Sequence, residues 1–418
     1  MVSRHKRNDL FCFSIAVSII IMMNPYFVWT SFSHLLQICS NVFVIVVLTY
    51  ELIHIIVTSK VESKQVVLVT LIMGYVIYRT INSHGLSLIY HLKVVFPVMQ
   101  LIAFSMLTEE ERLKTYAYFK KIFCVLLCMG LFTYPLAVFN VRFAGLGDVL
   151  LSESSAWSNG GYYYKNYFLA IYTANDSAFL GYIGRFCGVF NEPGVVGTFS
   201  ALFLIADRFD LTKKDNLIFL ISGLLAFSFA FYMMIGVYLL LFGLMTSELF
   251  RSRKKWMYFG AGIVCLIVVV VLWLCNSSFH NLLNELIISR LKRFMVGDDN
   301  RTTLVFDAVY SSFKTNGGFF HHLFGNGFGS VVFNEELTNT SSYKTQIYDL
   351  GYFGLIYLYT ICIYANMVVN PLKNRKAKMA LLCIFLMSTY QRIGILDVSY
   401  MSILMCGGND NWTKNAIN

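Results

Sequence analysis

The feature that most constrains this chain is a series of apolar runs separated by short polar stretches. About twelve runs can be counted, and many approach the roughly 20 residues that a helix needs to cross a bilayer core. Because 57% of the residues are hydrophobic and only 13% are charged, a water-soluble domain could not bury this much apolar surface. Helices satisfy their own backbone hydrogen bonds in lipid, so the sequence predicts an all-α, polytopic integral membrane protein. The predicted spans cover residues 10–28, 35–57, 66–78, 86–107, 122–139, 195–206, 217–231, 233–249, 256–275, 347–369, 380–395 and 398–406.

Clusters of lysine and arginine test whether successive loops alternate between the two sides of the membrane, because basic residues in short loops are retained on the cytoplasmic side. The clusters precede the first run and then follow every second run, so both termini are predicted to be cytoplasmic. The net charge of +10 therefore reports topology, and no nucleic-acid partner is expected. The first run is expected to be an uncleaved signal anchor. The basic residues concerned are Arg4, Lys6, Arg7, Lys60, Lys64, Arg112, Lys114, Lys120, Lys121, Arg208, Lys213, Lys214, Arg251, Arg253, Lys254, Lys255, Lys373, Arg375, Lys376, Lys378 and Lys414.

Two long segments, residues 140–194 and 276–346, face outward in this topology. They divide the chain into helices 1–5 over residues 1–139, a first outward loop, helices 6–9 over residues 195–275, a second outward loop, and the last helices with the tail over residues 347–418. Both loops contain aromatic residues, whose apolar side chains can pack together within the loop. Long loops with their own packing usually carry function.

The first candidate motif is GRFCGVFNEPG, from Gly184 to Gly194, directly before the sixth predicted span. It places Arg185 and Glu192 at the outer membrane boundary. A simpler interpretation is an interfacial arginine that binds phospholipid phosphate, with Asn191, Pro193 and Gly194 forming a helix start.

The second candidate motif is SRLKRFMVGDDNR, from Ser289 to Arg301. Arg290 and Arg293 would share one face of an amphipathic helix, and Arg301 would begin another helix capped by Asp299 or Asn300. Guanidinium groups bind phosphate oxygens in a bidentate way, although a surface helix that binds lipid headgroups would show the same pattern. The adjacent acids Asp298 and Asp299 are more simply turn or cap residues than ligands of a divalent cation, so no metal is predicted.

The third candidate motif joins HHLFGNGFGS, from His321 to Ser330, with TSSYKTQIYDLGYFG, from Thr340 to Gly354. The glycines predict a tight turn rather than a dinucleotide site, because no strand-turn-helix unit surrounds them. His321 and His322 are candidate general bases, although a structural role in an aromatic loop is the alternative.

Charged residues inside predicted spans are costly, and each indicates a hydrated cavity or an ion pair. Glu51, Lys93 and Arg392 are such residues, with Lys93 the most suggestive and Arg392 near enough to a span end to snorkel. The ten cysteines lie mostly in apolar runs and are expected to be free.

In these loops the sequence resembles the Wzy-type O-antigen polymerases and, more distantly, the O-antigen ligases, a superfamily of C-type glycosyltransferase-like membrane proteins. The resemblance rests on GRFCGVFNEP, on the arginine-bearing start of the second loop, and on LFGNGFG followed by DLGYFGLIYL. The ligases carry a catalytic histidine about eleven residues before the glycine that corresponds to Gly351, where this chain has Thr340 followed by Ser341. This departure favours a polymerase over a ligase.

The resemblance implies transfer of a growing glycan from undecaprenyl diphosphate to the non-reducing end of a new lipid-linked repeat unit, at the periplasmic face of a bacterial inner membrane. It implies membrane lipids and a chain-length regulator protein as further partners, and neither a metal nor a nucleotide cofactor. A lipid-linked oligosaccharide flippase, which is a transporter, and an O-antigen ligase are the alternatives.

The leaving diphosphate of such a reaction develops negative charge, which preorganised cations would stabilise. We expect Arg290, Arg293 and Arg301 to hold one diphosphate and Arg185 to help hold the other. A base must also take the proton of the acceptor hydroxyl. The candidates for that role are Glu192, Asp349, His321 and His322.

Overall fold

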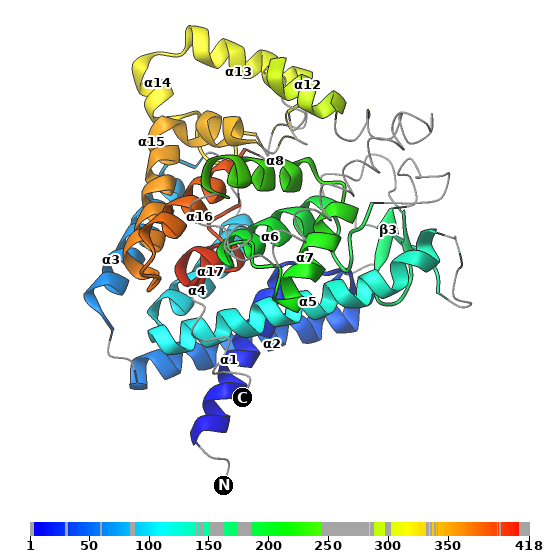
Figure 1. Ribbon diagram of the computed structural model, residues 1–418. Helices are drawn as coiled ribbons and strands as arrows, with labels where there is room; N and C mark the ends of the chain where they lie inside the picture. Colours follow the sequence, from blue (N-terminus) through cyan, green and yellow to red (C-terminus); the bar gives the residue numbers. More distant parts are fainter. Residues whose placement is uncertain are drawn as a thin grey trace. The chain divides into compact units, whose positions relative to one another are not determined.

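The computed structural model describes residues 4–29, 32–58, 61–83, 88–138, 141, 146–150, 163–173, 185–243, 284, 288–296, 302–331, 334, 337, 340, 342–390, 392 and 394–408. These residues are mostly helical (Figure 1). The α-helices are α1 (Arg4–Met22), α2 (His34–Thr58), α3 (Ser63–Ile81), α4 (Leu88–Met106), α5 (Glu109–Val138), α6 (Pro193–Ala206), α7 (Lys214–Leu225), α8 (Phe229–Tyr238), α12 (Ser289–Val296), α13 (Leu304–Asn316), α14 (Phe319–Phe324), α15 (Tyr343–Tyr364), α16 (Arg375–Ser388) and α17 (Val398–Cys406). Short irregular helical turns are η1 (Tyr26–Val28), η2 (Leu239–Gly243) and η5 (Ala365–Val369).

Four helices in the described part of the chain are long and apolar enough to cross a membrane. They cover His34–Val57, Ser63–Ile81, Glu109–Ala137 and Tyr343–Val369, and each coincides with a predicted span. Shorter apolar helices cover Asn8–Met22, Val95–Met106, Pro193–Ala206 and Phe229–Leu241. The chain is therefore a helical membrane protein. The predicted span over residues 256–275 lies outside the described residues.

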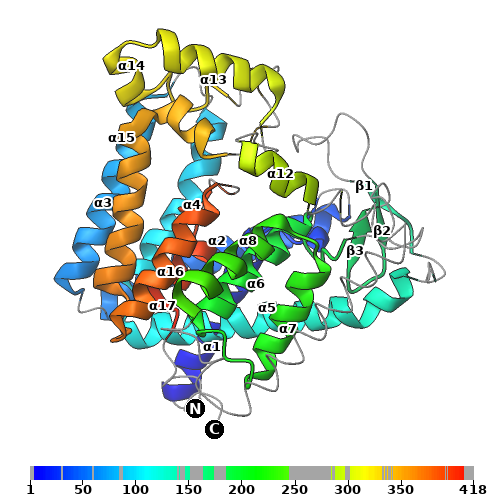
Figure 2. The same cartoon turned by 45° about the horizontal axis from the view of Figure 1, so that its top comes forward.

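Contacts divide the chain into two compact units. Unit 1 comprises residues 1–15, 45–116 and 299–418, and α15 packs against α3 and α16 in it (Figure 2). Helices α13 and α14 contact the beginning of α15. The apolar core beneath α13 is formed by Phe306, Tyr310, Phe313, Val331, Leu337 and Ile347.

Residues from three of the predicted basic clusters, Arg112, Lys64 and Lys378, lie at one end of unit 1. Arg112 is only 1% exposed, and its Nη1 donates hydrogen bonds to the carbonyl oxygens of Ser105 (3.2 Å) and Leu107 (2.9 Å), at the end of α4. A cation at a helix C-terminus compensates the partial negative charge of the terminal carbonyls. Arg112 is thus held as a helix cap rather than extending freely into a loop.

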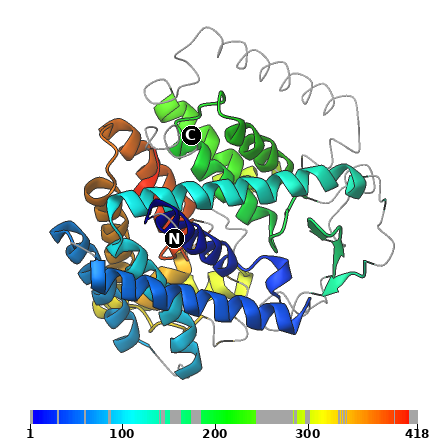
Figure 3. The same cartoon turned by 90° about the horizontal axis from the view of Figure 1, so that it is seen from below.

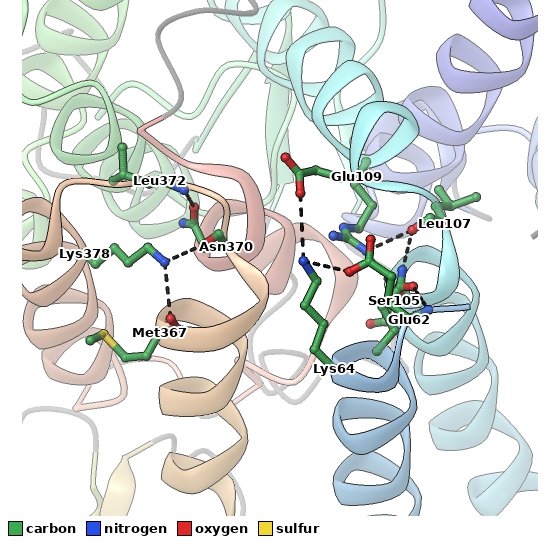
Figure 4. Close-up of polar contacts among 11 residues, drawn as sticks. Glu62, Lys64, Ser105, Leu107, Glu109, Met367, Asn370, Leu372 and Lys378 are labelled. Carbon is green, nitrogen blue, oxygen red and sulfur yellow. Dashed lines mark hydrogen bonds and ion pairs between the residues drawn. The ribbon is translucent and has the colours of Figure 1, made fainter. Parts of the chain in front are cut away.

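Lys64 and Lys378 occupy the same end of unit 1 (Figure 4). Lys64 forms ion pairs with Glu62 (2.8 Å) and Glu109 (3.9 Å). The Lys378 Nζ donates to the carbonyl of Asn370, beyond the end of α15 and η5. The basic residues Lys64, Arg112 and Lys378, which come from three of the predicted basic clusters, therefore lie at one end of this unit.

Unit 2 comprises residues 16–44 and 117–298, and α6 packs against α7 and α8 in it. Its core is aromatic: the ring of Phe123 lies 5.2–5.6 Å from those of Phe190, Phe199 and Phe203, and the Phe203 and Phe219 rings stack at 5.1 Å. Edge-to-face and offset contacts of this kind add to the stabilisation from apolar burial.

A small antiparallel sheet in unit 2 departs from the all-α prediction. Its strands are β1 (Val149–Leu150), β2 (Tyr163–Asn166) and β3 (Ile171–Thr173), in the order β1-β2-β3. In the register Val149 lies opposite Tyr164, and Tyr164 lies opposite Thr173. The sheet belongs to the first predicted outward loop, of which residues 151–162 and 174–184 lie outside the described residues.

The predicted break between the seventh and eighth spans, near Tyr232, is misplaced. Helix α7 ends at Leu225 and α8 begins at Phe229, so Tyr232 lies within α8. Phe227 adopts a positive φ of 44°, which no helix interior tolerates. The apolar pattern continues through this turn and so did not reveal it.

Candidate functional site

The third motif folds around a sharp kink in α15. Gly351 has φ 66° and ψ −179°, a conformation that is essentially restricted to glycine, and it divides α15 into two helical segments. Gly325, at the end of α14, also has a positive φ of 79°. A Cβ atom built on Gly325 would lie 2.5 Å from the backbone nitrogen of Gly351, so the two glycines allow the two halves of the motif to touch.

The glycine loop, residues 325–331, is hydrogen-bonded to the first segment of α15. The backbone N–H groups of Asn326 and Gly327 donate to the carbonyl oxygens of Tyr348 (2.8 Å) and Asp349 (2.9 Å). The turn predicted from the glycines is confirmed, because Gly327 and Gly329 also adopt positive φ angles.

The side chain of Asp349 also binds the glycine loop, through hydrogen bonds to its backbone. It is 8% exposed, and it accepts hydrogen bonds from the backbone N–H groups of Gly329 (3.1 Å) and Val331 (3.2 Å). Two backbone donors give both oxygens of this buried carboxyl group a hydrogen-bond partner. Asp349 therefore positions the glycine loop, and its role as a general base remains a prediction.

The end of α3 completes this arrangement, which we call the α3–α15 clamp: Tyr78, Arg79 and Asn82 together with residues 324–331 and 348–351. The Tyr78 hydroxyl donates to the Leu350 carbonyl (2.7 Å), and the Asn82 side chain donates to the Phe324 carbonyl (2.6 Å). The Arg79 guanidinium lies 3.6 Å from the centre of the Phe328 ring, a cation–π contact.

The three α3 residues were not identified from the sequence. The one available signal was Arg79, a basic residue at the outward end of the third predicted span, where the retention of positive charge disfavours it.

The two histidines of α14 point in different directions. His321 is exposed, and its Nε2 is hydrogen-bonded to the side-chain oxygen of Asn326 in the glycine loop. The Nε2 of His322 is bonded to the carbonyl oxygen of Phe313 in α13, 2.8 Å away. His322 therefore joins α14 to α13, whereas His321 is the accessible imidazole of the pair.

Two exposed aromatic residues directly precede His321 in the sequence. Phe319 and Phe320 are 74% and 73% exposed at the start of α14, and their rings pack edge to face. Aromatic rings at such a position suit either a sugar face or the interfacial region of a bilayer.

Arg185 and Glu192 belong to unit 2. The Nε and Nη2 atoms of Arg185 donate to the carbonyl oxygens of Ala226 (3.2 Å) and Phe227 (3.1 Å), directly after α7. Arg185 thus caps α7, and diphosphate binding by this residue remains a prediction.

Glu192 is the N-cap residue of α6, and Pro193 occupies the first turn of that helix. The helix start predicted from Asn191, Pro193 and Gly194 is confirmed, since proline suits a first turn where its missing N–H is not needed. The Glu192 side chain forms no capping bond to α6.

The amphipathic helix predicted around Arg290 and Arg293 is α12, on which Leu291, Lys292 and Met295 are exposed. The side chains of Arg290 and Arg293 and the whole of residues 297–301 lie outside what the structure describes, so the arginine cluster is not placed. One detail of the prediction is wrong: α13 is capped by Thr303, whose side chain accepts from the Phe306 N–H, and not by Asp299 or Asn300.

In the described parts of the chain, no three His, Cys, Asp or Glu side chains come together in a way that could hold a metal ion. The eight cysteines described there form no disulfide bonds. Comparison of the chain with family models, curated proteins and solved structures found no match.

Proposed function

We propose that the chain is a membrane-bound glycosyltransferase that polymerises a surface polysaccharide of the O-antigen type. It transfers a growing glycan from undecaprenyl diphosphate to the non-reducing end of a new lipid-linked repeat unit, at the periplasmic face of the inner membrane. A helical membrane protein with separately packed segments between its spans suits a substrate whose lipid stays in the bilayer while its sugars lie in water.

The observation that carries the proposal is the packing of the glycine loop onto the kinked start of α15. The resemblance to the polymerases rests partly on LFGNGFG and DLGYFG, and these two stretches contact each other through hydrogen bonds from Gly327 and Gly329 to Asp349. His321, which is bonded to Asn326 of the clamp, is exposed, and so are Phe319 and Phe320 in the same helix, which supports a role in binding or deprotonating a sugar hydroxyl.

The deletion phenotype tests the reaction class. A strain that lacks the gene is expected to carry lipopolysaccharide with a single repeat unit in place of the ladder of long chains, because delivery and ligation continue while polymerisation stops. Gel electrophoresis of its lipopolysaccharide is the measurement. Long polymer that accumulates on undecaprenyl diphosphate would instead identify a ligase, and the absence of any repeat unit from the surface would identify a flippase.

The proposed binding of the diphosphate by arginines is tested by converting Arg290, Arg293 and Arg301 singly to alanine and to lysine. Each alanine variant is expected to shorten or abolish the polysaccharide ladder, and lysine to restore it only in part, because an ammonium group cannot bind phosphate in a bidentate way. Lys292→Ala on the exposed surface of α12 is the matched control and should leave the ladder unchanged. With equal amounts of protein in the membrane, ladders of normal length in all six arginine variants would contradict diphosphate binding by these residues.

A further inference from the structure

A carboxyl group without a partner lies inside unit 1. Glu51 of α2 is 0% exposed, and neither of its carboxyl oxygens has a hydrogen-bond partner among the described residues. It belongs to the apolar helix His34–Val57, which is long enough to cross a membrane. Placing an ionised carboxylate in such surroundings without a donor costs several kcal/mol even after the protein relaxes.

The neighbouring carboxyl group, that of Glu111 in α5, has the opposite environment. Its Oε1 lies 2.9 Å from the Nε2 of His54, and its Oε2 accepts from the N–H (3.2 Å) and the hydroxyl (2.8 Å) of Thr108. Thr108 and Glu111 form a capping box in the first turn of α5, where the helix dipole favours negative charge. Glu111 therefore carries a stabilised negative charge, and this charge interacts with Glu51.

The described cations that lie next to Glu111 in the sequence of α5 are bound to other groups. Lys114 of α5 forms an ion pair with Asp9 of α1, and Arg112 donates to carbonyl oxygens at the end of α4. His54 is bonded to Glu111. Among the described side chains, Cys12 of α1 interacts with Glu51, Glu110 and Glu111, and none of these groups supplies positive charge.

Helix α1 packs an aromatic side chain against the part of α2 that carries Glu51, and within unit 1 its first turns lie between α2 and α5 (Figure 3). The buried Phe11 ring lies 5.3 Å from the ring of Tyr50 and 4.6 Å from that of His54. His54 is one helical turn from Glu51, on the same face of α2, and its side chain is 23% exposed.

We propose that Glu51 is a proton-binding site within the membrane part of unit 1, and that it exchanges its proton with water through His54. In the loaded state the carboxyl group is neutral, which removes both the unpartnered charge and the repulsion from Glu111. On release, the proton passes to the imidazole of His54, which becomes a cation paired with Glu111 and then returns the proton to water. This site is independent of the proposed transfer reaction.

Carbodiimide labelling of the full chain in lipid nanodiscs tests the site. Dicyclohexylcarbodiimide is apolar and adds to a protonated carboxyl group, and the adduct rearranges to a stable acylurea that retains every atom of both reactants. Peptide mass spectrometry is expected to find the label on Glu51, with a rate that falls about tenfold for each pH unit above the midpoint of its titration. Glu51→Gln should abolish the label at this position, and Glu62→Gln, which alters a half-exposed carboxylate of the same unit, should leave it unchanged.

Infrared spectroscopy supplies a second readout that needs no reagent. The carbonyl band of a protonated carboxyl group should be present in the unmodified protein and absent in Glu51→Gln, and after a jump to high pH it should decay several-fold more slowly in His54→Phe. Identical spectra of the unmodified protein and Glu51→Gln at every pH would overturn the proposal. Suppression of labelling by Na⁺ at constant pH would also overturn it, because Glu51 would then hold a metal cation rather than a proton.

Discussion

Gly351→Ala is expected to give the largest loss of folded protein of any single substitution in the clamp. A side chain at φ 66° and ψ −179° costs about 1–3 kcal/mol in backbone strain. The added Cβ would also lie 2.2 Å from the carbonyl oxygen of Leu323, so the contact between α14 and α15 would have to open. The effect is measured as the yield of monodisperse protein in detergent and as the temperature of thermal unfolding.

The matched control is Gly318→Ala, in the same segment of unit 1. A Cβ atom on Gly318 meets no other atom within 4 Å, and its φ of −70° suits any residue. This variant should unfold within a few degrees of the unmodified protein. If Gly351→Ala were as stable as Gly318→Ala, the kink would not be a fixed part of the fold.

Asp207→Asn is expected to destabilise unit 2 by about 3 kcal/mol, because it leaves the buried ammonium group of Lys120 without a charged partner. Lys120 donates to the Asp207 carboxylate, and Lys213 lies 3.5 Å from the same group. The double variant Lys120→Met/Asp207→Leu removes both buried charges and should recover much of the loss. Thermal unfolding of the three proteins in one detergent is the measurement.

The neighbouring pair of Lys121 and Asp215 provides the control for this experiment. It joins α5 to α7 at 3.0 Å, but the lysine is 56% exposed, so Asp215→Asn should cost less than about 1 kcal/mol. Equal losses from Asp207→Asn and Asp215→Asn would show that burial does not set the strength of the inner pair.

The inner pair should also make unfolding sensitive to acid. Burial raises the pKa of Asp207, but the charges of Lys120 and Lys213 outweigh it, and the net pKa lies below the usual range. A carboxyl group whose pKa is lower in the folded state contributes stability above its unfolded pKa and loses it as the pH falls through the folded pKa. The difference in stability between the unmodified protein and Asp207→Asn should therefore be full at neutral pH and shrink in acid.

The sequence predicted those parts of the fold that depend on local pattern. The four long apolar helices, the turn at Gly325–Gly329, the start of α6 at Pro193 and the helix at Arg290 follow from residues close together in the chain. The α3–α15 clamp could not be predicted in this way, because Tyr78 and Asn82 bind residues more than 240 positions away.

Competition among local partners explains the remaining errors. Asp299, Asn300 and Thr303 are all acceptable N-cap residues, and only the path of the chain into α13 selects Thr303. Among the charges predicted within spans, Glu51 proved to be the isolated one, whereas the side chain of the more suggestive Lys93 lies outside the described residues. Sequence pattern reveals that a charge is buried, but its partners are set by tertiary packing.

The glycine loop has one further consequence for how the protein can recognise phosphate. Every backbone N–H from Gly325 to Val331 already donates, to carbonyl oxygens of α14, α15, Asn82 or the loop itself, or to the Asp349 carboxylate. A glycine-rich segment of this kind cannot act as an anion-binding nest, which requires unoccupied amides that converge on the ligand. A pyrophosphate group bound against this loop would therefore have to be neutralised by side chains, which places its recognition there on arginine and lysine.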